Sequence, residues 1–519
     1  MMPTIIEVMC NEALQNLTTA GAQLPEGTGL MLEAYFKSLA QANGQYPSSL
    51  NLVQESQKFL ASGAGGPELI AELMATDPIA PLRLLGQTNS AMFARNNPVE
   101  SMLGVVQRLG FRRTADALRD FGEPKNYQAV FLGRALGLGA LHRMVLAQQI
   151  AEDLARIVAP RSPLRERAAL WSQLSRLPLL LMAYIKPNIY AALQLDRSLE
   201  GRNVFERNIK KALGKSLYDL ASGLCDNSHI PLNISKVVQH LELPPWNRRG
   251  GAGEDSAEAL LMVRVSFIAN RLADEIGRFS GKDEVDTLID EYAEKSGIKQ
   301  EQIESALGEA ALGFVRRMQL LGVKGYRLPS YLIEYQDEMV GADGVARKRH
   351  PQYSPLAERI NPYLYELRAS LKSVPGEGEP GFLPQAVMCT LQALVHAMQF
   401  DRAMLFRPSA DGRLLEPTVL FGQAPKQSVV TPRLLKASNA DFMPDVQAFI
   451  EGKVIFTGDP IYGDDWPFCA FPIVSDREVV GVFYADKLEN KNASPLETQE
   501  QVSVIALAEL WQGVPAAYR

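Results

Sequence analysis

Cysteine and histidine are scarce in this chain, which has four cysteines and five histidines in 519 residues. The cysteines form no CxxC pair, and the histidines form no HxxxH motif and no His-Asp dipeptide. Zinc sites and disulfide frameworks depend on such clusters. We therefore expect free thiols in a reducing compartment, no metal and no cofactor.

Long apolar runs and an excess of positive charge are also missing. The longest uncharged apolar stretch covers 177–185, whereas a membrane-spanning helix needs about 20 residues. The N-terminal segment MMPTIIEVMCNEAL has no basic region and does not resemble a signal peptide. The formal net charge of -6 gives no general attraction to nucleic acid or anionic membranes. We expect a cytoplasmic protein with neither of these as a partner.

One near match to a catalytic motif can be discounted. Gly214-Lys215-Ser216 resembles the end of a phosphate-binding P-loop, which needs a glycine five residues before Gly214. Position 209 is isoleucine. The glycine-rich turn that would direct backbone amides at a phosphate is therefore absent.

Helical periodicity dominates the chain up to about residue 340. In VESMLGVVQRLG, for example, apolar residues recur at i, i+3, i+4 and i+7 from Met102 to Leu109. The same pattern predicts further helices over 128–157, 163–183, 202–224, 231–241, 256–279, 284–296 and 299–321. The sequence predicts an all-α domain over 41–325, preceded by a helical extension over 1–40.

The pattern changes near residue 370. Proline and glycine crowd 373–384, and we expect a linker over 326–377. Two pairs of apolar runs follow, in 403–422 around Asp411-Gly412 and in 468–485 around a polar turn, and each predicts a β-hairpin. Helices are expected over 384–398, part of 431–452, and 495–512, the last opening with Ser494-Pro495 at its capping box. The sequence predicts a separate α/β domain over 378–513.

The segment TDPIAPLRLLGQTNSAMF, residues 76–93, contains an unusual polar pair, Asn89-Ser90. Asp77 before Pro78 predicts a helix N-cap. Asn89 shares the helical face of Leu82 and Leu85, so a buried, hydrogen-bonded role is expected. No suitable nucleophile or base accompanies it. We interpret Asn89 as a polar clasp between helices rather than a catalytic group.

The stretch ELIAELMATDPIAPLRLLGQTNSAMFARNNPVESMLGVVQRLGFRR, residues 68–113, resembles the HDOD domain, an HD-related output domain of bacterial signalling proteins. YPSSLNLVQESQKFL, residues 46–60, resembles its first helix. The resemblance implies an all-α, non-catalytic module in which Asp77, Pro78, Asn89 and Ser90 belong to a structural signature.

HD-family phosphohydrolases use a His-Asp pair on a helix to bind metal. The corresponding stretch here is LWSQLSRL, residues 170–177, with Ser172 and Gln173 in those positions. Neither side chain replaces an imidazole or a carboxylate ligand well. Downstream, only His240 remains where the family often has a histidine pair. The resemblance implies a degenerate HD site.

The stretch FCAFPIVSDREVVGVFYADKLENKNASPLETQEQVSVIALAELW, residues 468–511, resembles the end of a GAF domain. GAF domains commonly bind a small molecule above their sheet. The aromatics expected to line such a pocket are Phe406, Phe421, Trp466 and Phe468. The alternative is that these rings fill the core and that the domain serves for dimerisation.

The sequence predicts a non-enzymatic bacterial signal-transduction protein. The HDOD-like module would contact a signalling protein, and the GAF-like domain would sense a small molecule or join two copies of the chain. The alternative is a divergent HD-type, metal-dependent phosphohydrolase.

Overall fold

The computed structural model describes most of the chain from residue 49 onward. The described residues are 34, 49–62, 66–90, 97–120, 135–162, 164–200, 210, 213–247, 256–277, 282–323, 328–329, 331–332, 356–373, 383–423, 432–436, 443–461, 467–475, 477–488, 496–512 and 514. The predicted extension over 1–40 lies almost wholly outside them.

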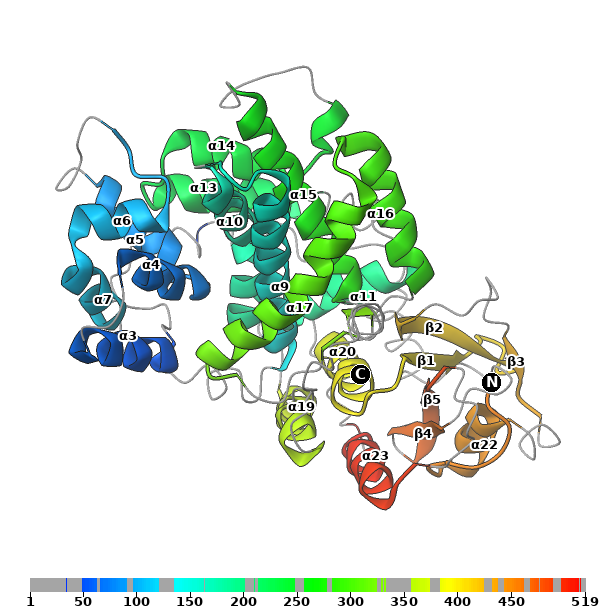
Figure 1. Cartoon of the computed structure of the whole chain (residues 1–519). Coiled ribbons are helices and arrows are strands. Elements are labelled where there is room, and N and C mark those ends of the chain that lie inside the picture. The colour runs from blue at the N-terminus through cyan, green and yellow to red at the C-terminus, as the bar shows by residue number, and fades with distance from the viewer. Residues whose placement is uncertain are drawn as a thin grey trace, which may run out of the picture.

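A bundle of long helices forms the centre of the helical region (Figure 1). The four longest are α9 (Ala135–Val158), α10 (Arg165–Ile185), α15 (Ala257–Ile276) and α17 (Gln300–Leu320). Helix α9 lies among the other three and packs against each of them. Shorter elements surround this bundle: α11 (Pro187–Glu200), α13 (Leu217–Asn227), α14 (Leu232–His240), the 3-10 turn Pro245–Asn247 and α16 (Lys282–Ser296).

Five short helices form a group beside the bundle, drawn in blue in Figure 1. They are α3 (Leu50–Ser62), α4 (Pro67–Thr76), α5 (Ala80–Asn89), α6 (Met102–Leu109) and α7 (Phe111–Asp120). Gly86 lets α5 approach the bundle closely, because a Cβ at this position would lie 2.0 Å from the carbonyl oxygen of Ser228. The N-terminal helices and the bundle therefore share one apolar core.

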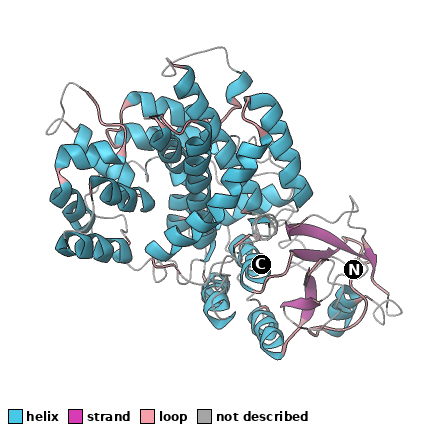
Figure 2. Cartoon of the chain, viewed as in Figure 1, coloured by secondary structure: helices cyan, strands magenta, loops and turns pink. Residues whose placement is uncertain are grey.

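The C-terminal region holds a five-stranded antiparallel sheet, and every strand that the structure describes lies in it (Figure 2). The strands are β1 (Arg402–Pro408), β2 (Leu414–Gly422), β3 (Arg433–Leu434), β4 (Phe468–Ser475) and β5 (Glu478–Asp486), in the order β3-β2-β1-β5-β4. Both predicted hairpins are confirmed, as β1–β2 and β4–β5. Because the strands are antiparallel, the region is α+β rather than a wound α/β fold.

The sheet buries both faces. One face packs with α20 (Leu383–Gln392), the π-helical turn Ala393–Ala397 and α23 (Thr498–Leu510). The residue after α23, Trp511, lies tilted against Phe483, with 5.2 Å between the ring centres. The other face packs with α22 (Pro444–Glu451) in a second apolar cluster. Residues alternate between these two clusters along β5, as the period of two requires.

Glu366 ties the C-terminal region to the bundle. It lies on α19 (Leu356–Lys372) and is fully buried. Its Oε2 accepts from the Leu136 backbone N–H at 3.0 Å, and its Oε1 accepts from Gln385 Nε2 at 2.9 Å. Leu136 is in the first turn of α9, where backbone N–H groups have no partner within the helix and negative charge is favourable. Helix α20 also packs on α9 and α11, so the two regions meet over a continuous interface.

Several details differ from the sequence-based expectations. The helix predicted over 202–224 is interrupted at Gly214–Ser216, because Ser216 is the N-cap of α13. The linker predicted over 326–377 is wrong for 356–372, which form α19 with a buried face of Tyr363, Glu366 and Leu367. The last helix has Glu497 as its N-cap in a capping box with Glu500, three residues after the predicted start at Ser494. Helix α11 was not among the predicted helices.

Within the described part of the chain, no helix combines the length and the apolar character needed to cross a membrane.

Replacing Glu366 with leucine should lower the free energy of unfolding by about 1–3 kcal/mol, because the Leu136 N–H and the Gln385 amide lose their buried acceptor. Urea unfolding followed by circular dichroism would measure this. Glu358→Leu is the matched control, since Glu358 is exposed on the same helix. Equal unfolding midpoints for the two variants would show that the buried carboxylate does not secure the interface.

Candidate functional site

Asp77 organises the turn between α4 and α5. Its Oδ1 accepts from the backbone N–H groups of Ile79 and Ala80, both at 2.9 Å, and its Oδ2 accepts from Ser49 N at 3.0 Å. The helix itself begins at Ala80, with Ile79 as its formal N-cap. The Asp77 side chain thus makes the predicted capping contacts, although Asp77 lies two residues before the N-cap. It also fixes the start of α3.

Asn89 ends α5 and holds the segment that leads into α6. Its Nδ2 donates to Leu85 O and Val99 O, both at 2.9 Å, and its Oδ1 accepts from Val99 N at 2.8 Å. Ser90 Oγ donates to Gln87 O at 2.7 Å. Asn89 is half-buried, and all of these partners are backbone groups. The pair therefore serves the joint between two helices.

Ser172 and Gln173 lie on α10 and are buried. Ser172 Oγ donates to Asn270 Oδ1 at 2.6 Å. Gln173 Nε2 donates to Asp77 O at 2.8 Å and Ala75 O at 3.2 Å. The Ala75 carbonyl and Gln173 Oε1 also accept from Gln148 Nε2, at 2.6 and 3.4 Å. Both side chains join helices to one another.

His240 ends α14. It is not among the residues that line a cavity beside Gln173. Within the described ranges, no three His, Cys, Asp or Glu side chains come together as a group that could hold a metal. A hydroxyl and an amide that are already bonded inside the protein do not suit a divalent cation.

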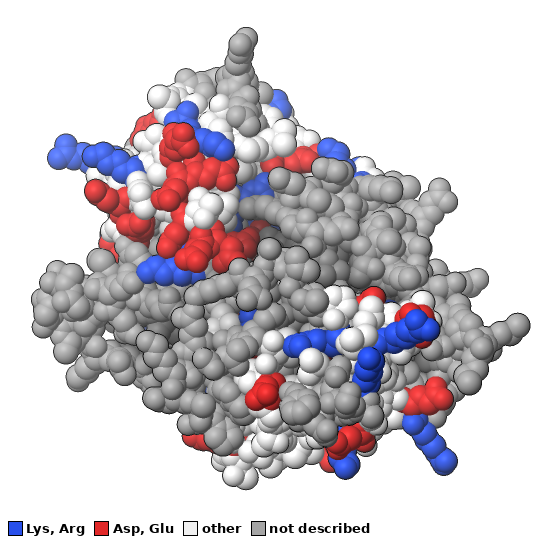
Figure 3. Space-filling model, turned by 90° about the vertical axis from the view of Figure 1, so that its right-hand side faces the viewer, with Lys and Arg blue, Asp and Glu red and all other residues white. Residues whose placement is uncertain are grey.

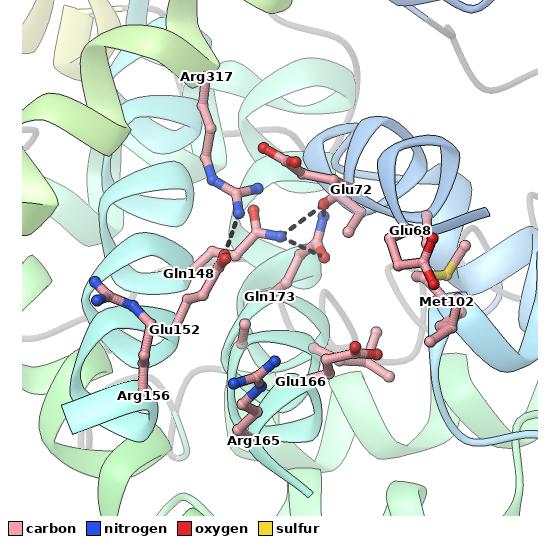
Figure 4. Close-up of a pocket in the computed structure, with 15 residues that line it drawn as sticks. Glu68, Glu72, Met102, Gln148, Glu152, Arg156, Arg165, Glu166, Gln173 and Arg317 are labelled. Carbon is pink, nitrogen blue, oxygen red and sulfur yellow. Dashed lines mark hydrogen bonds and ion pairs between the residues drawn. The ribbon is translucent and has the colours of Figure 1, made fainter. Parts of the chain in front are cut away.

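A cavity of about 330 Å³ lies where the N-terminal helices meet the bundle (Figure 4). Five helices contribute to it: α4, α6, α9, α10 and α17. Helical spacing explains its walls, because Gln148, Glu152 and Arg156 recur every four residues along one face of α9. The lining residues are Glu68, Ala71, Glu72, Ala75, Met102, Leu103, Gln148, Glu152, Arg156, Arg165, Glu166, Ala169, Leu170, Gln173 and Arg317. Among the predicted site residues that the structure describes, Gln173 alone lines this cavity.

Arg317 is the buried cation of this cavity. Its guanidinium donates to Gln149 Oε1 at 2.6 Å, to Thr76 Oγ1 at 3.2 Å and to the Glu152 carboxylate. Figure 4 shows the side chains of Arg317 and Glu152 directed toward each other. These bonds use all three nitrogens of the guanidinium.

Glu166 stands at the opposite side of the cavity. Burial raises its pKa, and the carboxylates of Glu152 and Glu68 add to the rise against the opposing effect of Arg165. Sequence reasoning missed this cavity because its walls come from segments up to about 250 residues apart. The local sequence signal for the cavity was the spacing of charged residues at i, i+4 on α4 and α9.

The predicted pocket aromatics do not share one face of the sheet. Phe406 and Phe468 are fully buried in the cluster beneath α22, and Phe468 stacks on Tyr484 at 5.9 Å between ring centres. Phe421 belongs to the opposite cluster and lies 5.4 Å from the ring of His396. Trp466 lies outside the described residues.

Asp445 is a buried carboxylate on the same side of the sheet as Phe406. Neither of its oxygens has a hydrogen-bond partner, and its nearest cation is Arg433, whose Nε lies 3.7 Å from Oδ2. Burial raises the pKa of this carboxyl, although Arg433 and nearby backbone N–H groups oppose the change. Sequence analysis did not single out this residue.

Residues 47–244 match the HDOD domain family, so the chain contains an HDOD domain. The match covers α3 to α14, and α15 and α17 pack onto it. No curated protein matches the sequence.

Several solved structures are similar to parts of the chain. The MmoQ response regulator of Methylococcus capsulatus str. Bath is 17% identical and covers 50% of this chain and 96% of its own, with a TM-score of 0.37. An HDOD domain protein of Geobacter sulfurreducens is 15% identical over 56% of this chain and 98% of its own, with a TM-score of 0.28. The GAF domain of a phosphoenolpyruvate-protein phosphotransferase of Coxiella burnetii is 18% identical over 30% and 92%, with a TM-score of 0.23.

Replacing Asn89 with leucine should lower the free energy of unfolding by about 1–3 kcal/mol, because the Val99 N–H and two carbonyls lose their partner. Gln87→Leu is a matched control, since Gln87 is an exposed amide on the same helix. Thermal and urea unfolding would report the difference. If the two variants unfold alike, the clasp contributes nothing to stability.

Asp445 should make the stability of the C-terminal region depend on pH. Because its folded pKa is raised, the folded state binds the proton more tightly. Relative to Asp445→Asn, the native protein should be most stable below the unfolded pKa of about 3.9 and lose stability as pH rises through the folded value. Urea titrations of both proteins from pH 4 to 8 test this. A difference that stays constant over the whole range would rule it out.

Proposed function

We propose that this chain is a non-catalytic regulatory protein of signal transduction, in which the HDOD domain is the output module that contacts another protein. The HDOD match supports the signalling role. We infer the absence of catalysis from the hydrogen bonds that Ser172 and Gln173 make. In an HD-type hydrolase these positions hold the metal-binding pair, whereas here they bond to Asn270 and to backbone carbonyls.

The residues that line the cavity also support a non-catalytic role. Activation of water for phosphoester cleavage needs a metal or a base aimed into the site. Gln173 is neutral, and its amide group is occupied. No histidine lines the cavity among the residues described. The alternative, a divergent phosphohydrolase, would have to use the glutamates alone as metal ligands.

We also propose that the C-terminal region is a GAF-like module. The sequence resemblance over 468–511 supports this, together with a sheet that has α20 and α23 on one face and α22 on the other. The buried, unbonded carboxylate of Asp445 favours a ligand on the α22 side. The alternative, that this module joins two copies of the chain, is supported by exposed apolar residues on α19 and α23. These are Tyr365, Val502 and Ile505.

The surface charge of the bundle bears on its partners. The described face in Figure 3 carries a concentration of acidic side chains. Helix α16 and the start of α17 supply exposed carboxylates, namely Asp283, Glu284, Asp290, Glu294 and Glu301. Such a surface repels nucleic acid and anionic lipid. We therefore propose a signalling protein as the partner, and neither nucleic acid nor membrane.

The purified protein should contain no stoichiometric divalent metal and should hydrolyse neither generic phosphoesters nor cyclic dinucleotides. The reason is the pair Ser172-Gln173 in place of metal ligands. Elemental analysis after dialysis and phosphate-release assays with added Mn²⁺ or Mg²⁺ would measure both properties. About one transition metal per chain, retained on dialysis, or metal-dependent turnover would overturn the proposal.

A further inference from the structure

Helix α23 has apolar residues on two faces. Val504, Leu507 and Ala508 are buried in the core that the helix shares with the sheet. Val502 and Ile505 are on the outer side, with 58% and 39% of their surface exposed. The outer face of a surface helix is polar as a rule, because water covers it. The outer face of α23 is instead apolar, as it is in helices that bind a partner.

Helix α19 packs against α23 and adds to this exposed face. Figure 1 shows both helices at the lower edge of the molecule. Tyr365, near the middle of α19, is 58% exposed. Arg368 and Lys372 follow it at i+3 and i+7, on the same exposed side of the helix. The α19/α23 surface is defined here by six residues: Tyr365, Arg368, Lys372, Val502, Ile505 and Glu509.

The two helices carry opposite charges on this surface. Helix α19 contributes Arg368 and Lys372, and α23 contributes Glu509. All three side chains are exposed, and none of them forms an ion pair with another described residue. Their charges are therefore available to a partner.

The spacing of charged and apolar residues is the same on both helices. Lys372 follows Tyr365 by seven residues, and Glu509 follows Val502 by seven residues. Seven residues are about two turns, so each charge lies about 10.5 Å along the helix from its apolar residue. If α19 of one copy lies along α23 of another with Tyr365 on Val502, Lys372 comes opposite Glu509. A two-fold axis makes the same contact a second time, so the surface is complementary to itself.

The length of the two helices limits the strength of such a contact. Helix α19 has 17 residues and α23 has 13. Side by side they present a face of about 20 by 20 Å, or about 400 Å² per copy, which is half of a standard interface. We therefore expect weak association, with a dissociation constant on the order of 10–100 µM.

We propose that the α19/α23 surface joins two copies of this chain in a symmetric dimer. This rests on the role given above to the C-terminal region as a module that joins two copies. A ligand on the α22 side would lie on the other face of the sheet, so the two roles are compatible. The inner face of α19 holds Glu366 at the first turn of α9. The dimer contact and the contact with the bundle are thus on opposite faces of one helix.

Sedimentation velocity on the full chain should show a monomer at about 1 µM that becomes a dimer as the concentration rises to about 300 µM. Val502→Glu should weaken association at least about 10-fold, because each copy would bury an unpaired carboxylate. Leu312→Glu is the matched control, since Leu312 is 43% exposed on α17 and outside the surface. It should leave the dissociation constant unchanged.

Reversal of the charges identifies the contact. Lys372→Glu and Glu509→Lys should each weaken the dimer about 3- to 30-fold, because two ion pairs per dimer become repulsive. The double variant exchanges the charges and keeps the pair, so it should associate as the native protein does. Only a contact between these two residues in different copies gives this rescue together with the loss in each single variant.

A chain that stays monomeric at the highest concentration would overturn the proposal. A dimer that none of the variants weakens would also overturn it, as would a double variant that associates no better than the single ones. If Val502→Glu lowers the melting temperature of a protein that is monomeric throughout, another segment of the same chain covers this face and the proposal fails. None of these outcomes bears on the signalling role or the lack of hydrolase activity proposed for the HDOD domain.

Discussion

The burial of α9 is the constraint on which the structure depends. From Leu136 to Ala155 nearly every residue of this helix is inside the protein, including several that are polar. A buried polar group without a partner costs about 1–3 kcal/mol, and most of these side chains are bonded to a neighbouring element. The neighbours that supply the bonds are different helices, and α9 therefore fixes their positions relative to one another.

The partners of α9 can be followed along its length. At its first turn, the Leu136 N–H donates to Glu366 on α19. Two turns further on, Arg143 donates to Gln194 and Tyr190 of α11. Beyond it, Gln148 reaches the end of α4, and Gln149 accepts from Arg317 of α17. One helix thus positions the C-terminal region, the bundle and the N-terminal helices.

The periodicity of the sequence predicted most of this architecture, because helices and hairpins are local. Asp411-Gly412 is at the β1–β2 turn, and the predicted helices over 163–183 and 299–321 match α10 and α17 within two residues. Helix α19 was missed because it directly precedes the proline- and glycine-rich stretch 373–384, and its buried face is defined by distant elements, chiefly α20, the turn Ala393–Ala397 and α23. Phe421 and Phe406 were grouped together because each lies on a predicted strand, but Phe421 pairs with Ala403, whose side chain is on the opposite face of β1 from Phe406. The cavity is formed by five helices that are distant from one another in the sequence, so no local sequence pattern predicts it.

The cavity lies at the joint between the N-terminal helices and the bundle. Its inner wall is the polar joint at which Gln148 and Gln173 hold the carbonyl end of α4. The amide of Gln173, which the sequence resemblance places at a metal-ligand position of an HD site, donates to the carbonyl oxygens of Ala75 and Asp77. A carboxylate at this position could accept hydrogen bonds but could not donate to these two buried carbonyls. The joint between α10 and the turn after α4 therefore requires an amide, a group that is a poor metal ligand.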